Sequence, residues 1–215
     1  MSYRLVVFDW DGTIIDSAAT IAECIQRAAG DLALPVPSRE RASHVIGLGL
    51  QDALRGAVPE LTAERYPEFV ARYRAHFFER QDRMALFDGM RELLAELSRK
   101  KTLGIATGKS RRGLDRHLAA TGLAPYFSAS RCADETYPKP HPAMLLELMA
   151  ELQVPKAQVL MIGDTSHDLE MARAAGVDAL AVTYGAHPAD SLRDCGPLGC
   201  FPDVGSLSLW LSQNA

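Results

Sequence analysis

The fold of this chain is decided by one segment, Leu5-Val6-Val7-Phe8-Asp9-Trp10-Asp11-Gly12-Thr13. Its first four residues form an apolar run that predicts a buried strand. Asp9 and Asp11 follow directly, and buried carboxylates are costly unless a cation or a reaction uses them. Gly12 lets the chain turn sharply after them. Because open α/β sheets build ligand sites where strands end, we expect both aspartates to share one small pocket with a cation, for which Mg²⁺ is the expected ion.

Three further strand ends carry polar residues. A predicted strand at 102–106 leads into Thr107-Gly108-Lys109-Ser110, and one at 158–162 leads into Gly163-Asp164-Thr165-Ser166-His167-Asp168. Lys139 lies between two prolines, just before a helical stretch. Each of these residues also has an ordinary interpretation, as a helix cap, a turn former or a solvated loop charge. Four such strand ends in one chain make a shared site the better interpretation.

The motif order D-x-D-G-T, T-G, K-P and G-D-x-x-x-D is similar to that of the haloacid dehalogenase superfamily of Mg²⁺-dependent phosphotransferases. The motifs occur in this order over about residues 5–170. Within the superfamily, the chain most resembles phosphoglycolate-phosphatase-like members, which carry a helical cap inserted after the first motif. The resemblance implies a phosphatase with an α/β fold, in which a doubly wound parallel sheet forms a Rossmann-like core.

The resemblance also implies roles for the acidic residues. Asp9 would attack phosphorus and form an aspartyl-phosphate, while Asp11 would protonate the leaving oxygen and later activate water. Mg²⁺ would bind the Asp9 carboxylate, the Asp11 backbone carbonyl and the Asp164 carboxylate. Asp168 would hold a metal-bound water or orient Lys139.

The phosphoryl group itself needs hydrogen-bond donors and positive charge. The hydroxyl of Thr107 and the backbone N–H groups of Gly108 and Lys109 stand at a predicted helix start, which is an anion-binding arrangement. Lys139 would supply a positive charge that steadies Asp9 and the charge that develops during transfer.

The chain divides into two kinds of pattern. Residues 16–85 read as helical with almost no strand signal, whereas helices alternate with short apolar strands from Met90 onward. That alternation predicts a parallel sheet covered on both faces. We therefore expect a core domain of residues 1–15 and 86–215, with residues 16–85 inserted as a helical cap that closes over the substrate.

Within the expected cap, Gly47 and Arg55 are candidates for contacts with the substrate. Gly47 could instead be only a helix stop, and Arg55 a solvated helix charge. Ser17 is expected to cap the first cap helix at its N-terminus. His117 and His187 are expected to be surface or packing residues.

Composition limits the partners and the compartment. The net charge of −4 and the lack of a basic run argue against nucleic-acid or membrane binding. The four cysteines form no C-x-x-C pair and the start does not resemble a signal peptide, which favours a reducing compartment. We expect a cytoplasmic enzyme, a monomer or weak homodimer, that acts on a small phosphorylated metabolite.

Several alternatives are left open by the sequence. Asp11 argues against dehalogenation, which needs no proton donor, and Thr13 and Ile21 stand where related sugar-phosphate mutases carry a valine and a histidine. A phosphotransferase of the mutase type, a pyrophosphatase and a nucleotidase remain possible within the superfamily. A receiver-type signalling domain is much shorter and has no cap. A non-catalytic relative would not need every catalytic position.

Overall fold

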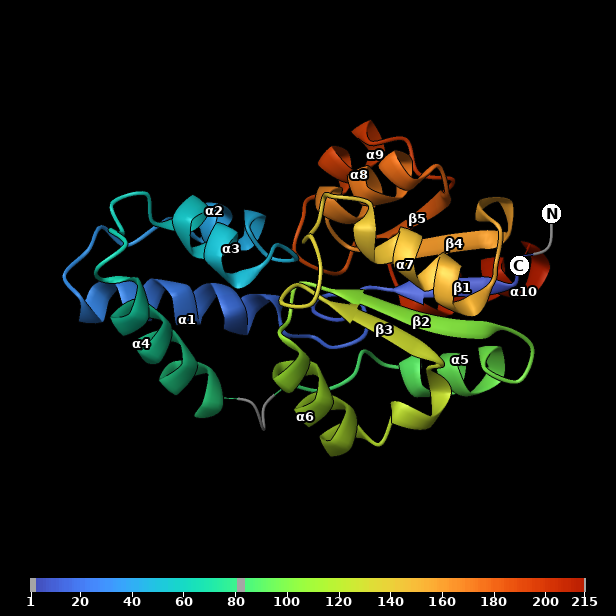
Figure 1. Ribbon diagram of the computed structural model, residues 1–215, viewed down its shortest axis with the longest axis horizontal. Helices are drawn as coiled ribbons and strands as arrows, with labels where there is room; N and C mark the ends of the chain where they lie inside the picture. Colours follow the sequence, from blue (N-terminus) through green and yellow to red (C-terminus); the bar gives the residue numbers. More distant parts are fainter. Residues whose placement is uncertain (1–2, 81–83, 215) are drawn as a thin grey trace.

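The computed structural model describes residues 3–80 and 84–214. Figure 1 shows two regions: a parallel sheet with helices on both faces, and a group of helices at one end of it. The prediction of a doubly wound parallel sheet is confirmed. Part of the predicted cap, residues 81–83, lies outside the described residues.

The sheet of the described residues has six strands in the order β3-β2-β1-β4-β5-β6, all parallel. The strands are β1 (Leu5–Phe8), β2 (Thr102–Thr107), β3 (Ala129–Cys132), β4 (Val159–Gly163), β5 (Asp178–Val182) and β6 (Cys200–Phe201). The apolar run of β1 is fully buried at the centre, between β2 and β4. The strand order reverses between β1 and β4, which is where this architecture forms its ligand crevice.

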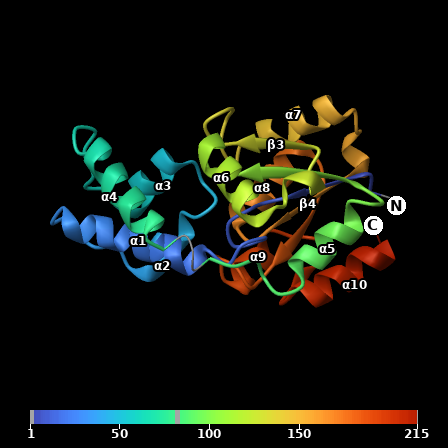
Figure 2. The same ribbon diagram turned by 90° about the horizontal axis from the view of Figure 1, so that it is seen from below.

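Helices cover both faces of the sheet, as Figures 1 and 2 show. One face packs against α5 (Met90–Leu97), α6 (Arg111–Thr121) and α10 (Val204–Asn214). The other packs against α7 (Ala143–Leu152), α8 (Ser166–Ala175) and α9 (Ala189–Asp194). Short 3₁₀ turns occur at Ala124–Tyr126 and Lys156–Gln158. The predicted strands 102–106 and 158–162 agree with β2 and β4 within one residue at each end.

The remaining helices form a separate group, called here the cap helices. They are α1 (Ala18–Asp31), α2 (Arg39–His44), α3 (Leu50–Ala57) and α4 (Tyr66–Phe78). They share a hydrophobic cluster of their own, in which Ile25, Leu54 and Phe69 are almost completely buried. Helix α1 runs through Gly30 and ends at Asp31. Among the described residues, no helix combines the length and the apolar character needed to cross a bilayer.

Two antiparallel segments connect the cap helices to the core. Ile15 forms a bridge with Leu86, and the N–H of Asp16 donates to the Ala85 carbonyl. The N–H of Phe87 donates to the Ile14 carbonyl in return.

One glycine allows the closest approach between a strand end and a helix. A Cβ added to Gly163, the last residue of β4, would lie 2.3 Å from Cγ of Asp168 in the first turn of α8. A Cβ added to Gly104 in the neighbouring strand β2 would meet only ordinary contacts, the nearest at 3.5 Å from Val7. Only the first of these two buried glycines is required by packing.

We therefore expect Gly163→Ala to lower the free energy of unfolding by about 1–3 kcal/mol, because an overpacked core must shift to accept the methyl group. Gly104→Ala is the matched control, and it should be neutral or slightly stabilising since alanine loses less backbone entropy than glycine. Urea unfolding followed by circular dichroism measures both. Equal stability of the two variants would contradict the packing argument.

Candidate active site

The four predicted strand ends come together at the carboxyl edge of the sheet. Asp9 follows β1, Asp164 follows β4, and Thr107 is the last residue of β2. Lys139 lies in the loop between β3 and α7, and Asp168 lies in the first turn of α8. All five side chains are buried, and none is more than 1% exposed. This arrangement agrees with the expectation that the polar strand ends, far apart in the sequence, form one shared site.

Lys139 holds two carboxylates at once. Its Nζ lies 2.6 Å from Oδ1 of Asp9 and 2.6 Å from Oδ1 of Asp168. Burial acts to lower the pKa of Lys139, but the Asp168 and Asp9 carboxylates outweigh it and raise this pKa above its usual value. The ammonium group therefore stays charged inside the protein. This is the contact that the sequence predicted between Lys139 and Asp9.

Asp168 is fixed by the start of its own helix. Its Oδ2 accepts hydrogen bonds from the backbone N–H of Thr165 at 3.1 Å and from the Thr165 hydroxyl at 2.7 Å. Thr165 and Asp168 together form a capping box on α8. The other carboxylate oxygen is thereby directed at Lys139. Asp168 therefore contacts Lys139, as one of its two predicted roles requires.

Asp164 is enclosed by backbone on two sides. A Cβ on Gly12 would lie 2.2 Å from its carboxylate, and a Cβ on Gly185 would lie 2.3 Å from it. Oδ1 accepts a hydrogen bond from the Thr13 hydroxyl at 2.8 Å, and Oδ2 accepts one from the Ala186 N–H at 2.7 Å. Burial and the nearby Asp168 carboxylate raise the pKa of Asp164 to about 7.

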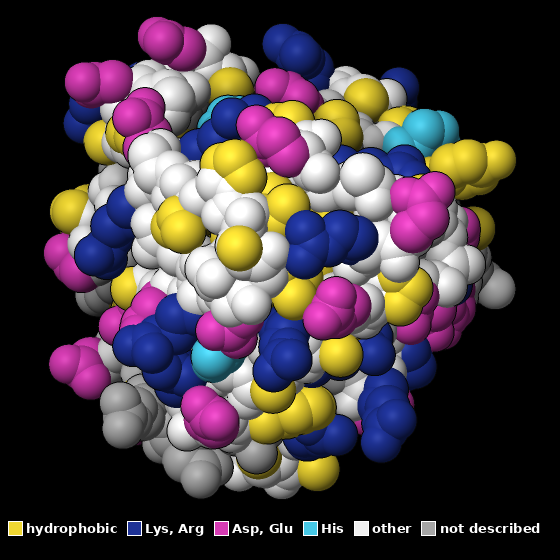
Figure 3. Space-filling view, turned by 90° about the vertical axis from the view of Figure 1, so that its left-hand side faces the viewer, with side chains coloured by type: hydrophobic (Ala, Val, Ile, Leu, Met, Phe, Trp, Pro, Cys, Tyr) yellow, Lys and Arg dark blue, Asp and Glu magenta, His cyan; other side chains and the backbone are white. Residues whose placement is uncertain are grey.

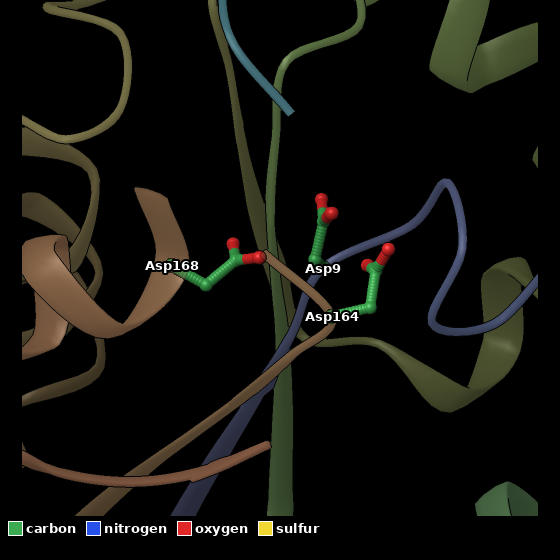
Figure 4. A group of neighbouring side chains, drawn as sticks. All are labelled: Asp9, Asp164 and Asp168. Carbon is green, nitrogen blue, oxygen red and sulfur yellow. The ribbon is translucent and has the colours of Figure 1, made fainter. Parts of the chain in front are cut away.

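The three carboxylates of Asp9, Asp164 and Asp168 converge, as Figure 4 shows. One oxygen from each lies within 4.8 Å of the others. Burial raises the pKa of Asp9 well above its usual range, since Lys139 only partly offsets the loss of water. Oδ2 of Asp9 is buried without a hydrogen-bond partner among the described residues. Three buried carboxylates with one ammonium group, and one free oxygen, form a donor set that suits a divalent cation.

Asp11 lies apart from these carboxylates and has different partners. Its Oδ1 is 2.9 Å from Nζ of Lys109 and accepts a hydrogen bond from the Ser17 hydroxyl at 2.7 Å. Burial acts to raise the pKa of Asp11, but Lys109 outweighs it and the pKa is lowered. Ser17 occupies the N-cap position of α1, yet its hydroxyl binds Asp11 instead of the helix, so the predicted side-chain cap is absent.

The predicted phosphate-binding segment follows β2. The Thr107 hydroxyl accepts a hydrogen bond from the Lys109 backbone N–H at 3.2 Å, so this N–H is already used and the charged side chain of Lys109 is what faces Asp11. Gly108 touches the cap, because a Cβ there would lie 2.4 Å from the Leu48 carbonyl oxygen. Here a side chain on residue 108 would separate the cap from the core.

The two predicted cap contacts differ in position. Gly47 has φ +92°, lines a cavity between cap and core, and faces Thr165, which a Cβ would approach to 3.1 Å. Arg55 is exposed on α3 and is not among the described residues that line the cavity. Arg74 of α4 does line it, although no motif or spacing singled this residue out.

Two groups of histidines connect cap and core in ways that the sequence did not predict. His117 accepts a hydrogen bond from the Trp10 indole at 3.2 Å and stacks on Phe77 of α4, with ring centroids 6.0 Å apart. The carbonyl of His44 accepts hydrogen bonds from Nε2 of both His167 and His187, at 2.9 and 3.0 Å. Trp10 and His167 lie within the first and last motifs, but their partners are distant in sequence, so only the fold could bring them together.

Burial keeps the core histidines of these contacts uncharged at neutral pH. Burial and the nearby Lys109 lower the pKa of His117 to about 4. Burial and the nearby His167 lower the pKa of His187 to about 4. His117 and His187 were expected to be surface or packing residues, and their burial, with less than 10% of each exposed, makes them packing residues.

Known proteins resemble the chain over nearly its whole length. The family model for haloacid dehalogenase-like hydrolases matches residues 6–182. A probable phosphatase, IndB, of Dickeya dadantii is 38% identical over 200 residues, which cover 90% of this chain and 86% of the relative. A phosphoglycolate phosphatase of Pectobacterium atrosepticum is 32% identical over 211 residues, covering 94% and 90%.

A solved structure extends this likeness to three dimensions. The crystal structure of a predicted phosphoglycolate phosphatase from Haemophilus somnus has 26% sequence identity and a TM-score of 0.87, and the match covers 99% of both chains. The motif order, the buried carboxylates at the sheet edge and these likenesses agree. The chain belongs to the haloacid dehalogenase-like hydrolase family, and within it resembles the phosphoglycolate phosphatases.

Proposed function

We propose that the chain is a Mg²⁺-dependent phosphomonoester hydrolase that acts on a small phosphorylated metabolite through an aspartyl-phosphate intermediate. The observation that carries this proposal is the buried carboxylate of Asp9, held by Lys139 at 2.6 Å, with an unpartnered Oδ2 at the end of β1. Relatives that are named phosphatases support the reaction class. The cytoplasmic location stays a prediction.

The residues present suit a magnesium ion. The Asp9 and Asp164 carboxylates and the Asp11 backbone carbonyl would hold it, and the raised pKa values of both carboxylic acids reflect negative charge that a cation would balance. When bound, Mg²⁺ supplies positive charge beside the transferred phosphoryl group.

Asp9 is the proposed nucleophile because it is rigidly placed and free on one side. Lys139 fixes Oδ1, which leaves Oδ2 as the oxygen that can attack phosphorus and form a new O–P bond while the bond to the leaving oxygen breaks. Thr107, buried at the end of the neighbouring strand, offers its hydroxyl proton to a phosphoryl oxygen. Water then attacks phosphorus and restores the Asp9 carboxylate.

Asp11 is the proposed acid and base. Of the two aspartates of the first motif, it is the one among the described residues that lines the cavity between cap and core, where a leaving group would lie. Lys109 and Ser17 fix its carboxylate. An incoming phosphate dianion competes with the Asp11 carboxylate for Lys109. The ionised form of Asp11 is then less stabilised, which favours the protonated form that can donate to the leaving oxygen.

Hydrolysis is favoured over mutase chemistry by the position of Thr13. Its hydroxyl donates to Asp164 at 2.8 Å. Thr13, which stands where mutases carry a valine, therefore helps to position the proposed metal ligand. The cap helices contact the core through Gly47 and Phe77, and their closure would exclude water from the intermediate.

Asp9→Asn should reduce turnover of an aryl phosphate by more than about 10³-fold, because it removes the nucleophile while keeping the side-chain volume. Asp16→Asn, an exposed change on the same segment, is the control and should keep the wild-type rate. Phosphate release in the presence of Mg²⁺ measures both, with circular dichroism to compare folding. Retained activity in a folded Asp9→Asn protein would rule out Asp9 as nucleophile.

Mg²⁺ should raise the melting temperature of the wild-type protein, because a ligand that binds only the folded state stabilises it. At a hundredfold excess over Kd the gain is about 2.7 kcal/mol, which corresponds to roughly 5–10 °C for a chain of this length. Asp164→Asn should lose most of that increase and Asp16→Asn none of it. Differential scanning fluorimetry measures the melting temperature independently of activity. If Mg²⁺ raised the melting temperature of Asp164→Asn as much as that of the wild type, Asp164 would not be a metal ligand.

A further inference from the structure

A cavity of about 560 Å³ lies between the cap helices and the core. Asp11 and Lys109 stand in its lining, so the cavity reaches the residue that is proposed to protonate the leaving oxygen. Its volume is in the range of sites that hold ring-sized organic ligands, about 300–1,000 Å³. A two-carbon alcohol such as glycolate would leave most of this space unfilled.

The walls of the cavity are mainly apolar. Helix α1 contributes Ile21 and Ile25, and α3 contributes Leu54. Helix α4 contributes Tyr73 and Phe77, whose rings stack with centroids 6.0 Å apart. A ligand that is itself apolar and flat would bury the most apolar surface against these ring faces and branched aliphatic groups, and so would bind here most favourably.

The size of the cavity does not result from an open cap. The cap already contacts the core on one side, where Leu48 faces Gly108, and on another, where the Phe77 ring stacks on His117. Nζ of Lys109 lies 5.1 Å from the centroid of the same ring. The space is therefore what remains for a substrate when cap and core are together.

The charges around the cavity do not provide for a carboxylate next to the phosphate. At the inner end, Lys109 is balanced by Asp11 at 2.9 Å. Arg74 and Arg112 also line the cavity but are exposed, and Arg116 lies over the Phe78 ring at 4.5 Å. Figure 3 shows that basic and acidic side chains intermingle over the end of the molecule formed by the cap. The cations left to pair with a short carboxylate are the guanidinium groups of Arg74 and Arg112, and because both are exposed to solvent such a pair would be weak.

We infer that the substrate is a phosphomonoester whose alcohol part carries an apolar ring, rather than a short carboxylate such as that of phosphoglycolate. The ring would lie among Ile21, Leu54 and Phe77, and the ester oxygen would face Asp11. The inference rests on the proposed function, because it assigns the cavity to the leaving group of that reaction.

Three primary-alcohol phosphates test it: ethyl phosphate, benzyl phosphate and 2-phosphoglycolate. We expect kcat/KM for benzyl phosphate to exceed the other two by about tenfold or more, since even one methylene in an apolar pocket is worth about tenfold. Phe77→Ala should reduce the ratio of benzyl to ethyl phosphate. Phe77→Leu, which keeps apolar volume without the ring, should give an intermediate ratio. Leu146→Ala, at a half-exposed position on α7 away from the cavity, should keep the wild-type ratio.

The outcomes separate this inference from the function on which it rests. Turnover of all three esters with phosphoglycolate preferred or equal would overturn the inference and leave the phosphatase intact. A benzyl preference that Phe77→Ala leaves unchanged would also overturn it, because the ring would then bind elsewhere. No phosphate release from any ester by the folded, Mg²⁺-supplied protein would overturn the proposed function, and the inference with it.

Discussion

The ammonium group of Lys139, buried between Asp9 and Asp168, is the interaction on which the rest of the site depends. A buried ion pair is seldom retained for stability alone, yet removing one partner typically costs about 3–5 kcal/mol because a charge is left unpaired. Here the pair joins the end of β1, the loop before α7 and the start of α8. It fixes one oxygen of Asp9 and leaves the other free, which is what a nucleophile requires.

The two aspartates of the first motif are separated by their surroundings. Asp9 is turned toward the core, where burial raises its pKa, whereas Asp11 faces the cavity, where Lys109 lowers its pKa. The two neighbouring carboxylates thus have different cationic partners, Lys139 for Asp9 and Lys109 for Asp11, which hold them in different parts of the site. Gly12 follows both aspartates, and its φ of +82° turns the chain between them and the cap helices.

The sequence predicted most of the core and the buried part of the site. Short apolar strands, helix caps and turn glycines are local signals, so β1, β2, β4 and their polar ends could be located in advance. Contacts between cap and core were not predictable in this way. The ring contact of Phe77 with His117, the cavity position of Arg74 and the exposed position of Arg55 depend on how α3 and α4 are oriented. The Ser17 hydroxyl donates to the Asp11 carboxylate and does not cap its own helix.

The most direct measurement of the central claim is acid quenching of a single turnover, followed by mass spectrometry of the peptide that contains Asp9. Asp11→Asn with an aryl phosphate is the combination to use, because a phenolate leaves without a proton donor whereas loss of the base slows hydrolysis of the intermediate and lets it accumulate. The account predicts one added phosphoryl group on Asp9, absent when Asp9→Asn is combined with it. Turnover without any phosphorylated aspartate, or with the group on another residue, would contradict it.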